Sequence, residues 1–180
     1  LVLLAQNDVG YHNLLRLATI SQLEGFYYRP RLDRQCLADH ADGLIVLSGC
    51  GSSEIARHIR DGRVDQARES VSWYRDVFPD RYYLELQEHD IPELEMVNRG
   101  TIALAREMGL PLVATNDLHY THQHDAKHHE ALLALQSGSK LSEPTYDEGG
   151  SRFAFSGNEY YLKSAAEMRA LFSEFPEALD

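Results

Sequence analysis

Short apolar runs alternate with longer segments of helical periodicity along this 180-residue chain. Four runs read as strands, because each is short, rich in apolar residues and bounded by turn-forming residues. These runs are residues 1–5 (LVLLA), 43–49 (GLIVLSG), 81–88 (RYYLELQE) and 111–115 (PLVAT). The second run holds four consecutive apolar residues, a pattern typical of a strand that is buried on both faces of a parallel sheet.

The segments between these runs carry the apolar spacing of amphipathic helices. We expect helices over residues 11–23, 34–40, 54–61, 64–78, 91–108 and 165–172, and another after residue 125. Residues 8–10 (DVG) are expected to form a turn. The candidate N-caps of these helices are Asp33, Ser52 or Ser53, Asp90, Asp125 and Ser164. Strand–helix alternation predicts βα units and a parallel sheet, either open or closed into a barrel.

Two segments are expected to be loops. Residues 24–30 (EGFYYRP) form an aromatic loop that is closed by a proline. Its rings could stack on bases or on a protein partner, but we expect them to pack over the core. Residues 142–156 are rich in turn-forming and polar residues, and they predict a surface loop.

Composition narrows the class of protein. The chain length suits one domain, and 43% hydrophobic residues suffice for a core. A net charge of −11 disfavours an independent nucleic-acid-binding module. The two cysteines form no CxxC pair, which favours a reducing, cytoplasmic location, and no apolar run is long enough to span a membrane. Because the chain starts inside an apolar run without Met, we expect it to be a piece of a longer protein.

The strongest candidate chemistry lies after the strand at residues 111–115. Asp117 and His119 follow it directly, and residues two apart on an extended chain project to the same side. An oxygen ligand beside an imidazole suits Zn²⁺ or Mn²⁺. The alternative is an ordinary helix cap beside a solvated ring. Active sites of parallel folds lie at the carboxyl ends of strands, and Cys50 and His89 occupy two other such ends.

The other candidates keep open alternatives. Cys50 could supply a thiolate ligand or be a small buried residue beside a tight turn. For His89, we favour an exposed residue before a helix over a metal ligand. We interpret the histidines at 122, 124, 128 and 129 as solvated side chains around a helix start. No P-loop, GxSxG or strand-associated GxGxxG motif is present.

Several segments together resemble a known family. They are LVLLAQNDVGYHNLLRLATISQLEGFYYRPRLD, GLIVLSGC, YYLELQEHD, PLVATNDLHY and NEYYLKSAAEMRALFSEFPEAL, in this order. The chain thereby resembles the PHP (polymerase and histidinol phosphatase) domain of bacterial DNA polymerase III alpha subunits, in nearly all of its length except residues 142–156.

The resemblance implies a fold and a metal site. The fold would be part of a distorted (βα)₇ barrel, TIM-like, with outer helices around parallel strands. Residues 1–180 would form the carboxyl-terminal portion of a single PHP domain, with about the last 20 residues leading into the next domain. By motif, Cys50, Asp117 and His119 match metal ligands, with zinc or manganese as the metal. The family's early ligands, including a His-x-His strand, would precede Leu1, so this chain would hold only part of the site.

The resemblance also implies three possible functions. The first is a fragment of a replicative DNA polymerase alpha subunit, a nucleotidyltransferase whose PHP domain carries metal-dependent 3′–5′ exonuclease activity. Polymerisation, with its Mg²⁺, would belong to residues beyond Asp180, so the fragment alone would be inactive. The second is a non-catalytic scaffold that supports the polymerase and docks a proofreading subunit. The third is a free-standing PHP phosphoesterase. The expected partners are DNA, through the full-length protein, and other holoenzyme subunits, without a membrane.

Overall fold

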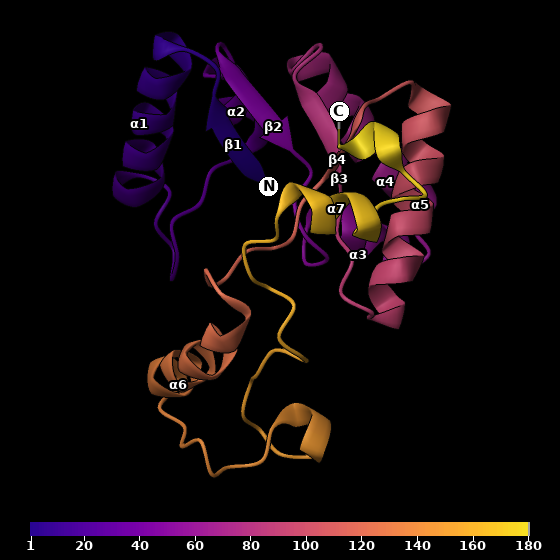
Figure 1. The fold of residues 1–180 in the computed structure, drawn as a ribbon. Coiled ribbons are helices and arrows are strands. Elements are labelled where there is room, and N and C mark those ends of the chain that lie inside the picture. The colour runs from indigo at the N-terminus through magenta and orange to yellow at the C-terminus, as the bar shows by residue number, and fades with distance from the viewer. Residues whose placement is uncertain (180) are drawn as a thin grey trace.

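Four strands form one sheet, in the order β1-β2-β3-β4. A computed structural model describes residues 1–179 of the chain (Figure 1). The strands are β1 (Val2–Ala5), β2 (Leu44–Leu47), β3 (Tyr82–Leu86) and β4 (Leu112–Ala114). β2, β3 and β4 are parallel, with Val46 opposite Tyr82 and Leu84 opposite Leu112. The predicted strands and their parallel arrangement are therefore confirmed for these three.

β1 runs antiparallel to β2 and forms one edge of the sheet. Because of this direction, the amino end of β1 lies beside the carboxyl ends of the other three strands. A side chain on Gly49 would come within 2.9 Å of the Leu1 nitrogen, which places Leu1 beside the turn after β2. The sheet is open, and the closed barrel is not seen within residues 1–179. Four strands are too few to curve round and pair with each other at both edges.

Helices follow the strands as the apolar spacing predicts. They are α1 (Asp8–Leu23), α2 (Arg34–Asp39), α3 (Glu54–Arg60), α4 (Val64–Val77), α5 (Pro92–Met108), α6 (Ala126–Ser137) and α7 (Ala165–Leu171). Short 3-10 turns lie at Gln123–Asp125, Tyr146–Glu148 and Pro176–Ala178. No helix within the described residues is long and apolar enough to cross a membrane.

Two predicted helix starts are wrong. Residues 8–10 do not form a turn but the first turn of α1, because the Asn7 side chain caps the helix by accepting from the Gly10 N–H. Asp90 does not cap α5. Its backbone has a positive φ of 55°, and the extended residue before the helix is Ile91.

The main core lies between the sheet and the helices that follow β2 and β3. Leu44, Val46 and Leu84 from the strands and Val71 and Phe78 from the α4 region are fully buried there. A smaller cluster, made of Leu86, Ile102, Phe172 and Ala178, packs the end of the chain against the sheet and α5. By contrast, α6 and the loop after it extend away from the sheet (Figure 1).

The aromatic loop after α1 does not pack over the core, which corrects the prediction. Phe26, Tyr27 and Tyr28 are 57%, 64% and 81% exposed. Tyr28 also has a positive φ of 59°, which turns the chain sharply at this point.

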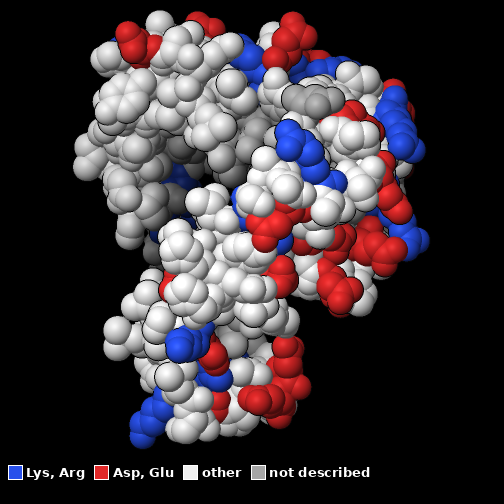
Figure 2. Space-filling model, viewed as in Figure 1, with Lys and Arg blue, Asp and Glu red and all other residues white. Residues whose placement is uncertain are grey.

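On the face seen in Figure 2, acidic and basic side chains are interspersed, and the view shows no extended basic surface.

Candidate functional site

The three candidate ligands lie around one cavity of about 480 Å³. Cys50 comes from the turn after β2, and Asp117 and His119 come from the segment after β4. The cavity is also lined by Gly51, Ser52, Arg60, Gln87, Ile91, Glu93, Leu94, Val97, Phe153 and Phe155. The carboxyl ends of three parallel strands therefore meet at a cavity, as expected for an α/β fold.

Asp117 and His119 form the closest pair of candidate ligands. His119 Nε2 lies 3.7 Å from Asp117 Oδ1, and each side chain is about one-third exposed. Asp117 has a φ of 44°, so a sharp turn rather than an extended strand brings the two together. Asn116 holds this turn, because its buried side chain donates to the carbonyl oxygens of Glu159 and Tyr161, both at 2.7 Å.

Cys50 lies in a turn of small residues that lines the same cavity. Its Sγ is 3.1 Å from Ser52 Oγ, and the residue is half-buried. Gly49, with a φ of 89°, supplies the left-handed conformation that this turn requires. Cys36 lies on α2 and is not among the residues that line this cavity. Burial and the neighbouring carboxylates of Asp33 and Asp39 raise the pKa of the Cys36 thiol.

A buried carboxylate that the sequence did not single out joins these strand ends. Glu85, on β3, is only 8% exposed. Its Oε2 accepts from the Gly49 N–H at 3.0 Å, and its Oε1 accepts from Thr115 Oγ1 at 2.5 Å and from Gln87 Nε2 at 3.0 Å. One side chain therefore connects the turns that carry Cys50 and Asp117. The only sequence signal was a charged residue between two leucines.

His89 does not line the cavity, and the prediction of an exposed side chain is wrong. Its ring stacks on Tyr160 with the ring centroids 4.1 Å apart. Both ring nitrogens are buried and have no hydrogen-bond partner among the described residues. Burial lowers the pKa of His89, although the nearby Asp117 charge acts in the opposite direction. The ring is therefore held in its neutral form close to the site.

The later histidines separate into two groups. His124 and His128 lie around Asp125 with side chains 74% and 66% exposed, as expected for solvated rings. His129 instead lies 5.2 Å from the His119 ring. Burial, together with repulsion from His119, lowers the pKa of His129.

The candidate ligands offer suitable donors but do not complete a metal site. Asp117, His119 and Cys50 provide a carboxylate, an imidazole and a thiol, which are all ligands that zinc accepts. Within residues 1–179, however, no group of three or more His, Cys, Asp or Glu side chains is arranged closely enough to hold a metal ion. These residues can thus supply part of a site only.

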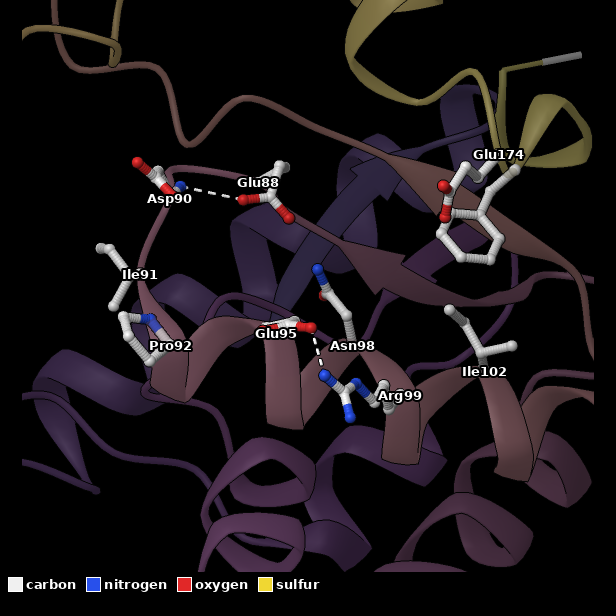
Figure 3. A pocket seen from close by; sticks show the side chains of 10 residues that line it. Glu88, Asp90, Ile91, Pro92, Glu95, Asn98, Arg99, Ile102 and Glu174 are labelled. Atoms are coloured by element: carbon white, nitrogen blue, oxygen red, sulfur yellow. Dashed lines mark hydrogen bonds and ion pairs between the residues drawn. The ribbon is translucent and has the colours of Figure 1, made fainter.

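A second cavity, of about 360 Å³, lies beside the start of α5 (Figure 3). It is lined by four carboxylates, which belong to Glu88, Asp90, Glu95 and Glu174. The one guanidinium in its lining, from Arg99, pairs with Glu95. Such a surface repels phosphates, so it does not extend the site formed by Asp117 and His119.

Comparisons with known proteins agree with the sequence resemblance. The PHP domain family matches residues 1–89, a range that includes Cys50 but not Asp117 or His119. The chain is 42% identical over 180 residues to the DNA polymerase III subunit alpha of Borreliella burgdorferi and 45% identical over 174 residues to that of Thermus aquaticus. The subunit of Campylobacter jejuni is 35% identical over 190 residues.

The matched segment makes up nearly all of this chain but only a small share of each relative. These three comparisons cover 97–100% of this chain but only 14–15% of the relatives. The chain therefore corresponds to a small segment of a much longer subunit.

Proposed function

We propose that this chain, whose residues 1–89 match the PHP domain family, works as part of a DNA polymerase III alpha subunit in bacterial DNA replication. The support is an identity of 35–45% along nearly the whole chain to subunits of that name. The full subunit would then be a cytoplasmic DNA-directed DNA polymerase that acts with DNA and the other holoenzyme subunits. Identity along the whole chain favours this function over a free-standing phosphoesterase.

Residues 1–180 would form the carboxyl-terminal portion of one PHP domain, with the last residues leading into the next. Further strands of the longer subunit would complete a distorted (βα)₇ barrel. The open sheet supports this, because β1 and β4 form its two edges. The position of Leu1 beside Gly49 supports it too, because a residue preceding Leu1 would lie close to the turn that carries Cys50.

Within that domain, we assign Cys50, Asp117 and His119 as part of a zinc or manganese site for phosphodiester hydrolysis at a 3′ end. The observation that carries this assignment is their convergence on one cavity from two strand ends, those of β2 and β4. A bound divalent metal would supply an activated water and a positive charge for the scissile phosphate. The chain's own contribution is to orient the donors. Asn116 fixes the Asp117 turn, and Glu85 fixes the turn that carries Cys50.

The full-length subunit tests this assignment. We expect the double variant Cys50→Ala, Asp117→Asn to lose bound zinc or manganese and 3′–5′ hydrolysis, while polymerisation is retained. Cys36→Ala is the matched control, because Cys36 lies outside the cavity and should leave metal content unchanged. Unchanged metal content and hydrolysis in the double variant would refute the assignment. A lower melting temperature with no loss of hydrolysis would instead favour a structural role.

A non-catalytic scaffold is the second candidate, and the exposed aromatic loop favours it. Phe26, Tyr27 and Tyr28 are mostly exposed, and Arg31 lies 5.4 Å over the Tyr27 ring. Exposed aromatic and arginine side chains are typical of protein interfaces. In this case the loop would contact the polymerase body or a proofreading subunit. Changing all three aromatic residues to Ser should weaken that contact without altering metal content.

A further inference from the structure

We infer that Phe153 and Phe155 form a base-binding wall, which holds the terminal nucleobase of single-stranded DNA beside Asp117 and His119. This inference rests on the proposed function, because it names how the substrate of that site is held. The sequence predicted only a polar surface loop for residues 142–156. The structure instead places both rings in the lining of the cavity that contains the candidate ligands.

The two rings differ in how firmly they are held. Phe155 lies between other rings, with its centroid 4.5 Å from His119 and 4.6 Å from Tyr160. Phe153 meets Phe155 edge-on at 5.3 Å and is 48% exposed. A fixed ring thus supports a second ring that still has surface available. Aromatic rings of this kind stack on bases with little regard to sequence.

The rest of the apolar lining suits the same ligand. Ile91, Leu94 and Val97 contribute aliphatic surface from α5 and the residue before it. The volume of about 480 Å³ lies within the usual range of small-molecule sites, and it can accept one base with its sugar. Gln87 and Ser52 also line the cavity and can hydrogen-bond to the polar edge of a base.

The charged side chains around the cavity favour binding of a base over binding of a phosphate that carries no cation. Arg60 is the only Lys or Arg among the lining residues, and it makes no ion pair within residues 1–179. Glu93 and Asp117 line the same cavity and repel a phosphate that approaches without a cation. Without metal, the base should therefore supply most of the affinity, with Arg60 contributing only to charged ligands.

The loop that carries the two rings is anchored at the residue directly before Phe153. Arg152 is 5% exposed, and it donates to Glu130 Oε1 at 2.7 Å and to the Glu143 carbonyl at 2.8 Å. This anchor fixes the backbone next to Phe153. A stacking surface that is already ordered binds a base with a smaller entropic cost.

NMR titration of the chain, with a chelator present, tests the inference. The Leu94 and Val97 methyl groups report on the cavity, and deoxyadenosine, dAMP and inorganic phosphate are the probes. We expect deoxyadenosine to shift these methyl signals. Phe153→Ala and Phe153→Leu should each weaken its binding about tenfold, because a flat ring is lost. Phe26→Ala, which removes an exposed ring outside the cavity, is the matched control and should leave binding unchanged.

Arg60→Gln separates the phosphate contribution. It should weaken the binding of dAMP but not that of deoxyadenosine. Arg57→Gln, on the same helix outside the cavity, should change the binding of neither ligand. A short single-stranded oligonucleotide should shift the methyl signals, and its circular form, which has no end, should not. Binding of mononucleotides alone would overturn the assignment to a DNA end.

Two further outcomes also overturn the inference. They are a wild-type chain whose Leu94 and Val97 signals do not respond to deoxyadenosine, and a folded Phe153→Leu variant that binds as wild type. Circular dichroism establishes that each variant is folded. Failure of the proposed function is distinguishable, because the titration contains no metal. Base binding with no metal-dependent hydrolysis in the full-length subunit would refute that function and leave the base-binding wall intact.

Discussion

The Gly49 N–H, in the turn after β2, donates at 3.0 Å to Oε2 of Glu85 on the neighbouring strand β3. Glu85 also accepts from Thr115, which precedes the Asp117 turn. A buried carboxylate needs such donors, because an unsatisfied charge in the interior is costly. The relative positions of Cys50 and Asp117 therefore depend on a side chain whose hydrogen bonds go to Gly49, Gln87 and Thr115.

Glu85→Gln should loosen this arrangement. The amide has one acceptor oxygen, so it cannot satisfy all the donors that the carboxylate now satisfies. We expect the free energy of unfolding to fall by about 1–3 kcal/mol. In a Cys36→Ser background, Cys50 should be alkylated faster than in the parent. Glu88→Gln, whose carboxylate accepts only from the Asp90 N–H in the part of the chain that is described, should change neither measurement.

Local patterns predicted the elements well, because strands and helices are specified by nearby residues. The continuous apolar run at residues 44–47 and the spacing along residues 64–77 both gave the observed elements. The direction of β1 could not be read in this way. Its antiparallel pairing with β2 depends on contacts between residues about 40 positions apart, such as Leu3 with Val46.

The candidate site was predictable only where a predicted strand was followed by side chains that can bind a metal. Cys50, Asp117 and His119 were found because parallel strands bring their carboxyl ends together. Phe153 and Phe155 gave no such indication, since they lie in a turn-rich loop that returns to the cavity from far along the chain. His89 was misjudged because its burial comes from Tyr160, a residue distant in sequence.

Gly10→Ala should be strongly destabilising. A Cβ on Gly10 would lie 1.8 Å from the Gly43 carbonyl oxygen, which is backbone and cannot rotate away. That oxygen also accepts from the Gln6 N–H at 2.8 Å, so it is held in place. We expect a loss of at least about 2 kcal/mol in denaturant unfolding.

Gly62→Ala is the matched control for that change. Gly62 has a φ of 71°, but a Cβ there would meet no atom within 4 Å. The expected cost is about 1 kcal/mol, from the left-handed conformation alone. Equal losses in the two variants would show that the contact between α1 and the turn before β2 is not rigid.

Arg152→Met should release the loop that carries Phe153. The change keeps the length of the side chain but removes its hydrogen bonds to Glu130 and the Glu143 carbonyl. We expect local opening to increase about tenfold, seen as faster proteolysis within residues 142–156. Arg169→Met, at an exposed arginine on α7, should leave the cleavage rate unchanged. Equal cleavage of the two variants would show that Arg152 does not anchor this loop.

His89 should make stability depend on pH in a defined direction. Burial lowers its pKa below 6.5 in the folded chain, so protons bind preferentially to the unfolded chain. The stabilising contribution of the neutral ring is therefore complete above pH 6.5 and is lost as the pH falls through the lowered pKa. His89→Phe keeps the stacking on Tyr160 and removes two buried nitrogens that lack partners among residues 1–179.

The melting temperature of wild type should consequently fall more steeply than that of His89→Phe between pH 7.5 and pH 5. At pH 7.5 the variant should be at least as stable as wild type, with a gain of up to about 1 kcal/mol because no polar atom is left unsatisfied. His12→Phe, at an exposed histidine on α1, should follow the wild-type curve. Parallel curves for wild type and His89→Phe would mean that the ring is protonated equally in the folded and unfolded chains. In that case its burial would place no constraint on the charge beside Asp117.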